Sequence, residues 1–184
     1  MPMETTQEET RSNMEKLHTG DTIRTFKGLY IDVFNPDPDT IDVEDIAHAL
    51  SQVCRFAGHT HKFYSVAQHC TECVTQMRLK LGRPSKKILL TMLMHDAAEA
   101  YLGDMARPIK RRLPQYKQAE ILLETVIAKK FGLDFPFPPI IKTIDNLMLE
   151  IEHDSVILKK NFFEVLSPSD AEGRFLNQFA ALHS

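Results

Sequence analysis

Four ionisable residues follow an apolar run near the middle of the chain: His95, Asp96, Glu99 and Asp104. The apolar residues of segment 88–94 have the spacing of a buried helix, and such a helix rarely carries adjacent ionisable groups without compensation. A bound cation would compensate one imidazole and several carboxylates. On a continuous helix His95 and Glu99, four positions apart, share a face, so one can hold a metal while the other addresses a water beside it.

Two further polar residues, His69 and Asp145, stand among apolar neighbours in other segments. Taken singly, His69 is more typical of a hydrogen-bonded core histidine, and Asp145 of a surface carboxylate. Together with His95 and Asp96 they supply two imidazoles and two carboxylates. That mixture suits a divalent first-row metal or Mg²⁺ better than a thiolate zinc site, and the joint pattern favours metal ligation.

The order of these residues resembles that of the HD-domain phosphohydrolases, whose pattern is H…HD…D. Here the pattern has separations of 26 and 49 residues, and the likeness covers about residues 41 to 158. It is closer to the small nucleotide-hydrolysing branch, the bacterial 5′-deoxynucleotidases and the compact phage deoxynucleoside triphosphohydrolases. The resemblance implies one divalent ion (Mn, Co, Zn, Fe or Mg) and four ligands: His69, His95, Asp96 and Asp145.

The same resemblance implies catalytic and substrate-binding residues. Glu99 and Asp104 match two catalytic carboxylates, which activate water or protonate the leaving 5′ oxygen. Other residues match or are candidates for the substrate-binding side: Arg55, Phe56, His59, Lys110 and Arg111. The arginines and the lysine would bind phosphate oxygens, and Phe56 would line the sugar or base pocket.

Several of these residues also have plain structural interpretations. Arg55 could pair with an acidic neighbour, Glu99 with a nearby base, and Asp104 could cap a turn. The basic run 110–112 could be a solvated face, and His59 could be an ordinary loop residue rather than a metal ligand or a phosphate donor.

The three cysteines favour a reducing compartment. Cys70 and Cys73 lack the second cysteine pair of a zinc ribbon, so we expect them to be core and surface thiols. The polar residues Glu152, His153 and Asp154 are expected on a solvated face of their helix.

The elements that must position these side chains are helices. Apolar periodicity predicts helices over 43–56, 63–81, 85–102, 115–131, 140–160 and 170–182, and segment 26–34 is expected as a short extended piece or hairpin. Little else suggests strands. We therefore predict an all-α fold. The resemblance implies that it is a single-domain HD-type helical bundle of five to seven helices around a central metal site.

Length and charge limit the remaining possibilities. A chain of 184 residues fits one domain, with a flexible arm over 1–20 and the folded domain over 21–184. The net charge of −3 argues against nucleic-acid binding driven by phosphate attraction. No apolar run has the length of a membrane span or of a signal peptide, so a cytoplasmic location is expected. By resemblance, a homo-oligomer is expected.

These observations predict a divalent-metal-dependent hydrolase of nucleotide phosphate esters, a 5′-deoxynucleotidase acting on nucleoside monophosphates. One alternative is a deoxynucleoside triphosphate triphosphohydrolase, for example a dATPase, which releases triphosphate. Another is a non-catalytic metal-binding module that works in regulation.

Overall fold

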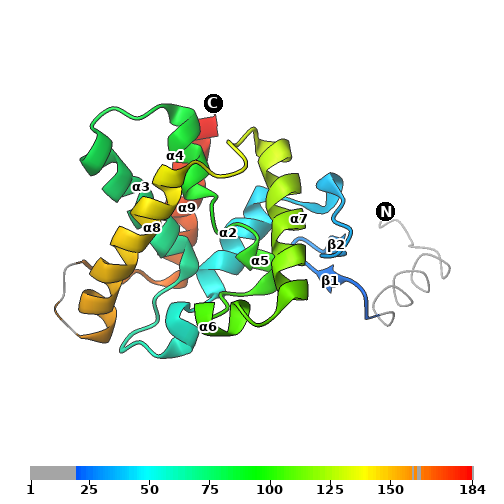
Figure 1. Ribbon diagram of the computed structural model, residues 1–184, viewed down its shortest axis with the longest axis horizontal. Helices are drawn as coiled ribbons and strands as arrows, with labels where there is room; N and C mark the ends of the chain where they lie inside the picture. The colour runs from blue at the N-terminus through cyan, green and yellow to red at the C-terminus, as the bar shows by residue number, and fades with distance from the viewer. Residues whose placement is uncertain (1–19, 159, 161–162, 184) are drawn as a thin grey trace, which may run out of the picture.

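The computed structural model of the chain describes residues 20–158, 160 and 163–183. The N-terminal arm that the sequence suggests therefore lies almost wholly outside the described residues. Within them the fold is helical, with eight α-helices rather than the expected five to seven (Figure 1). Their bounds are α2 Val43–Gln52, α3 Val66–Leu81, α4 Lys86–Leu93, α5 Glu99–Leu102, α6 Arg107–Lys110, α7 Pro114–Phe131, α8 Pro139–Glu152 and α9 Pro168–His183.

Small elements complete the fold. Strands β1 (Ile23–Arg24) and β2 (Tyr30–Ile31) form an antiparallel hairpin. A hairpin was one of the two structures expected for segment 26–34, although β1 lies just before that segment. Short helical turns lie at Pro38–Thr40 and Arg55–Gly58, and a π-helical turn over His153–Ile157 follows α8. None of the helices in the described ranges has both the length and the apolarity required to cross a membrane.

Side-chain caps mark the starts of several helices, and a glycine ends one of them. The carboxylate of Asp42 caps α2 by accepting a hydrogen bond of 2.8 Å from the backbone N–H of Glu44. Ser65 and Ser85 cap α3 and α4 in the same way. Gly132 ends α7 in the left-handed conformation that a glycine adopts without a side-chain clash.

One hydrophobic core joins these helices, and α9 lies at its centre, packed on α2, α3 and α4. Figure 1 shows α3, α8 and α9 side by side in one half of the molecule, with α7 and the hairpin in the other. Among the fully buried side chains are Ile46, Leu50, Met77, Leu93 and Phe175. The core thus fixes α3, α4 and α8 relative to one another, which matters because these helices carry the candidate ligands.

The expected continuous helix over 85–102 is wrong. Helix α4 ends at Leu93, the chain turns over 94–98, and α5 begins only at Glu99. The Nδ1 atom of His95 lies 2.8 Å from the carbonyl oxygen of Met92. A side chain that bonds a carbonyl this close in sequence competes with the helical hydrogen-bond ladder, so the helix ends there. His95 and Asp96 therefore lie in a turn, where both side chains can face the same point.

Candidate metal centre

Three separate elements bring the four predicted ligands together. His69 comes from α3, His95 and Asp96 from the turn after α4, and Asp145 from α8. The Nε2 atom of His69 lies 3.4 Å from Nε2 of His95, 3.4 Å from Oδ2 of Asp96 and 3.6 Å from Oδ1 of Asp145. His95 Nε2 and Asp96 Oδ2 are 3.3 Å apart. Two nitrogens and two oxygens thus converge within a few ångströms.

The other nitrogen of each imidazole is bound elsewhere. His69 Nδ1 lies 2.5 Å from a carboxylate oxygen of Glu152, and His95 Nδ1 lies 2.8 Å from the carbonyl oxygen of Met92. Both partners are acceptors, so each ring carries its proton on Nδ1. The two Nε2 lone pairs then face one another, an arrangement that requires a positive charge between them.

The pKa shifts of His69 and His95 are consistent with one positive charge shared by the two imidazoles. Burial and the positive charge of Arg55 act to lower the pKa of His69, but surrounding negative groups, including Glu152, outweigh both and raise that pKa well above its ordinary value. Burial is the main cause that lowers the pKa of His95. The pair is therefore arranged for one cationic charge, which a proton or a metal ion can supply.

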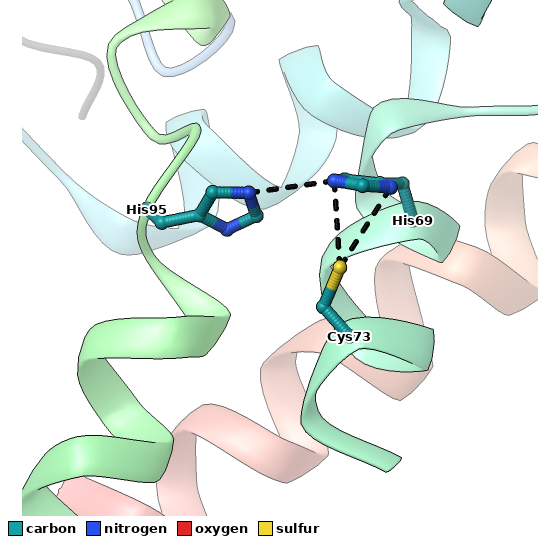
Figure 2. A group of neighbouring side chains, drawn as sticks. All are labelled: His69, Cys73 and His95. Carbon is teal, nitrogen blue, oxygen red and sulfur yellow. Dashed lines mark hydrogen bonds between the residues drawn. The ribbon is translucent and has the colours of Figure 1, made fainter. Parts of the chain in front are cut away.

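Thiols stand beside these imidazoles. His69, Cys73 and His95 form a buried group whose candidate ligand atoms lie within 4.8 Å of one another, and this group could hold a metal ion. Figure 2 shows the Cys73 sulfur directed at the His69 ring, with Sγ 3.5 Å from Nε2. Cys70 forms a second such group with His95 and Asp96. Both thiols of the helix are buried, so the expectation that one of them is a surface thiol is wrong.

Glu152 was expected on a solvated face, and that expectation is wrong. Its side chain is 0% exposed. It accepts hydrogen bonds from Arg55 (Nε 3.2 Å, Nη2 2.9 Å) and from the Tyr64 hydroxyl (2.9 Å), besides its contact with His69. Burial acts to raise the pKa of Glu152, but the charges of His69 and Arg55 outweigh it and lower that pKa. Glu152 is an ionised carboxylate that fixes a ligand and a buried cation.

The signal that could have identified Glu152 is its spacing along α8. Ile141, Asp145, Met148 and Glu152 recur at intervals of three or four, and all four are buried. Glu152 thus lies on the same helix face as the predicted ligand Asp145. His153, the next residue, is exposed, as expected.

The predicted catalytic carboxylates lie beside the centre. Glu99, the first residue of α5, is 7% exposed, and its Oε2 atom has no hydrogen-bond partner among the described residues. Burial, together with the charges of Asp96 and Asp104, raises the pKa of Glu99 well above its usual value. Burial also raises the pKa of Asp104, although Arg55 opposes the shift. Perturbed carboxyl groups next to a cavity are typical of acid–base residues.

The sequence left open whether Arg55 binds substrate phosphate or pairs with an acidic neighbour, and its position in the structure is compatible with both. It is buried in an ion pair with Glu152, yet its Nη1 atom lies 3.8 Å from Asp96 and 4.0 Å from Asp104. The following residue, Phe56, adopts the left-handed backbone conformation, with φ of 56°. A residue other than glycine rarely adopts this conformation, and such strain clusters at functional sites.

Two adjoining cavities open onto the centre. The smaller, about 240 Å³, is lined by both predicted catalytic carboxylates and by Arg55 and Phe56. The larger, about 730 Å³, is lined by His95, Arg111 and residues of α7 and α8. Both cavities share five lining residues: Asp96, Arg107, Lys110, Lys142 and Asp145.

Three cationic side chains line both cavities, and the sequence analysis indicated only one of them. Lys110 lies there, 2.5 Å from a Glu120 oxygen and 3.6 Å from Glu99. Arg107 and Lys142 were missed, although each pairs with Asp145, at 3.1 and 2.5 Å. The only sequence signal for Lys142 is its i, i+3 spacing to that aspartate. His59 is exposed in its loop and lines neither cavity, so the fold does not bring it to the centre.

Two known proteins that resemble the chain have names that state no activity. The chain is 36% identical over 175 residues to "Uncharacterized protein YfdR" of Escherichia coli (strain K12), with 85% of this chain and 93% of the relative covered. It is 33% identical over 143 residues to "Uncharacterized protein RCAP_rcc00048" of Rhodobacter capsulatus, with 72% and 71% covered. No family model matches the chain.

Proposed function

We propose that this chain, which belongs to the same family as YfdR of Escherichia coli, is a divalent-metal-dependent phosphohydrolase that acts on deoxynucleotides. The observation that carries the proposal is the convergence of His69, His95, Asp96 and Asp145 beside two carboxyl groups with raised pKa values, the buried Glu99 and the half-buried Asp104. The resemblance to the HD-domain phosphohydrolases supports the same assignment.

The donor set fits a divalent ion. His69 and His95 would supply nitrogen ligands, and Asp96 and Asp145 oxygen ligands. Nε2 of His69 lies 3.4 to 3.6 Å from a candidate ligand atom of each of the other three residues, and His95 Nε2 lies 3.3 Å from Asp96 Oδ2. A divalent ion held by these residues would lower the pKa of a water and polarise a phosphoryl oxygen.

The residues around the ligands supply the remaining chemistry. Glu99 and Asp104 line the smaller cavity, where one can accept a proton from the attacking water and the other can protonate the leaving 5′ oxygen. The bond between the water oxygen and phosphorus forms as the bond between phosphorus and the 5′ oxygen breaks. Lys110 and Arg107, which line both cavities, and Arg55, which lines the smaller one, can bind the phosphate oxygens.

The proposed substrate is a deoxynucleoside 5′-monophosphate, and a triphosphate substrate is the alternative. The row of cations shared by the two cavities favours that alternative: Arg107, Lys110 and Lys142. The Pα–O5′ bond would break in either case, so the products distinguish them: inorganic phosphate or triphosphate.

Product identification by chromatography tests the proposal. The purified protein is incubated with the eight common nucleoside monophosphates and the matching triphosphates, with Mn²⁺, Co²⁺, Zn²⁺, Fe²⁺ or Mg²⁺ added singly. We expect nucleoside and phosphate from the monophosphates, and no turnover by the Asp96→Asn variant. If no nucleotide is hydrolysed with any of these ions, the proposal fails and a non-catalytic metal-binding module is favoured.

A further inference from the structure

A buried thiol lies beside the nitrogen on which the candidate ligands converge. Cys73 follows His69 by one turn of α3, and its Sγ atom lies 3.5 Å from Nε2 of His69 (Figure 2). The Cys73 side chain is 0% exposed, and none of the roles assigned above uses it.

The sulfur of Cys73 is available to an ion that both imidazoles bind. Its hydrogen-bond contacts within the described part of the chain are with the His69 ring, at 3.5 Å to Nε2 and 3.8 Å to Nδ1. His69, Cys73 and His95 have candidate ligand atoms within 4.8 Å of one another. Asp96 Oδ2, which lies 3.4 and 3.3 Å from the Nε2 atoms of His69 and His95, can complete a set of four ligands.

Asp145 is a candidate ligand whose charge is compensated without a metal ion. Its Oδ2 atom pairs with Arg107 at 3.1 Å and with Lys142 at 2.5 Å. Its Oδ1 atom lies 3.6 Å from His69 Nε2, farther than the 3.4 Å that separate this nitrogen from His95 and from Asp96. Because two cations balance its charge, Asp145 does not become an unpaired carboxylate when it leaves the ion.

The exchange of Asp145 for Cys73 replaces one oxygen ligand by sulfur. Carboxylate oxygens suit harder ions such as Mn²⁺ and Mg²⁺, whereas thiolates select softer ions such as Cu⁺. Asp145 also lines both cavities, whereas Cys73 lines neither. An ion that binds Cys73 instead of Asp145 therefore loses its ligand from the cavity walls.

We propose that the centre has a second mode of metal binding, in which the Cys73 thiolate replaces the Asp145 carboxylate and the ion is thiophilic, as Cd²⁺ and Cu⁺ are. Both modes share three ligands: His69, His95 and Asp96. The thiol releases its proton to solvent when the sulfur binds the ion. Ions of the proposed reaction keep Asp145 as their ligand, and a thiophilic ion excludes them because both modes need the same imidazoles. Only this exclusion of an activating ion rests on the proposed function.

Titration of the metal-free protein with Cd²⁺ tests the thiolate ligand, because a bond between sulfur and Cd²⁺ gives a charge-transfer band in the near-ultraviolet. We expect one saturable band in wild type. Cys73→Ala should lose the band and bind Cd²⁺ at least about tenfold more weakly. Cys54→Ala is the matched control and should keep both, because Cys54 belongs to neither group of candidate ligands.

Several outcomes of this titration would overturn the assignment. They are the absence of a band in wild type, a band that persists in Cys73→Ala, and a band that Cys70→Ala loses instead. Thermal unfolding shows whether each variant is folded, and Cys73→Ser, which keeps the size of the side chain, replaces Cys73→Ala if the latter is not.

A second measurement tests the exchange of ligands. Asp145→Asn should bind Cd²⁺ within about threefold of wild type, although it loses most of its affinity for Mn²⁺. Wild type loaded with Cd²⁺ should bind no Mn²⁺ in calorimetry. Equal losses of Cd²⁺ affinity in Asp145→Asn and Cys73→Ala, or undiminished Mn²⁺ binding to the Cd²⁺-loaded protein, would overturn the exchange. If wild type binds no Mn²⁺ or other activating ion, the proposed function fails, while the Cd²⁺ band still decides whether Cys73 is a ligand.

Discussion

His69 Nδ1 and Glu152 Oε1 lie 2.5 Å apart, although 83 positions separate the two residues in the chain. The contact joins α3 to the end of α8 and leaves His69 Nε2 free to face the other ligand atoms. A carboxylate that accepts from the second nitrogen of a metal-binding imidazole fixes its tautomer and raises its basicity. If His69 binds a metal ion as proposed, Glu152 contributes to metal affinity as well as to stability.

Replacing Glu152 by Gln should weaken metal binding. An amide offers His69 and Arg55 a weaker, neutral acceptor, and loss of such a partner typically costs about 10–100-fold in metal affinity. Titration of the metal-free protein with Zn²⁺ or Co²⁺ measures the change. Glu150→Gln on the same helix is exposed and should bind as wild type does. Equal affinities of both variants would contradict the role of Glu152.

The identity of the fourth ligand can be tested by a pair of variants. Cys73 lies near the imidazoles, but Asp145 completes the two-nitrogen, two-oxygen set. We expect Asp145→Asn to lose most of the metal affinity and Cys73→Ala to retain it within about threefold, a change of less than 1 kcal/mol. The reverse order would assign the centre to His69, Cys73 and His95.

Glu99→Gln should separate metal binding from turnover. The variant keeps the shape of the side chain but cannot accept a proton, so hydrolysis should fall by about 10²–10⁴-fold while the bound metal remains. Rates are measured on the best nucleotide, and metal content by elemental analysis. A metal-loaded variant with wild-type rates would remove Glu99 from the mechanism.

Arg55→Lys tests the fork-shaped guanidinium. In the structure Nε and Nη2 bind Glu152 while Nη1 faces Asp96 and Asp104. A lysine cannot make both contacts, so kcat/KM should fall by about tenfold or more, corresponding to roughly 1.4 kcal/mol. Arg112→Lys, on the exposed turn after α6, is the control and should leave kcat/KM unchanged.

Glu124 should make stability depend on pH. Its pKa rises from 4.5 to about 7 in the folded protein, so between these values the folded state binds more protons than the unfolded state. The free energy of unfolding then falls as pH rises through this window, and the full contribution of Glu124 is present only below pH 4.5. Urea unfolding of metal-free wild type and Glu124→Gln at pH 4.5, 6 and 8 measures it.

We expect the variant to gain on wild type from pH 4.5 to 7 by about 1–3 kcal/mol, less than the full shift would give because the side chain is only partly buried. Above pH 7 the difference should become constant. If wild type and Glu124→Gln differ in free energy of unfolding by the same amount at all three pH values, solvent screens Glu124 in the folded protein.

Some of the fold and of the site could be predicted from sequence because the signals are local. Apolar periodicity predicted the starts of the helices at Val43, Pro114 and Pro168 within a few residues. The break after α4 was missed, since it depends on one contact between a ring nitrogen of His95 and the carbonyl of Met92. Periodicity cannot register a hydrogen bond that a side chain makes to the backbone of a residue nearby in the chain.

The sequence by itself determined which residue types are present and how far apart they stand along the chain. It supplied two imidazoles and two carboxylates as candidate ligands, and it placed Glu99 and Asp104 four and nine positions after His95. Only the tertiary structure decided that the ligands from α3, α8 and the turn face one point, that Glu152 lies behind His69, and that Arg107 and Lys142 reach Asp145. The physical reason is that convergence depends on how α3, α4 and α8 pack around the core. Packing is set by the shapes of many side chains together, whereas a residue's type and spacing are properties of a short stretch of chain.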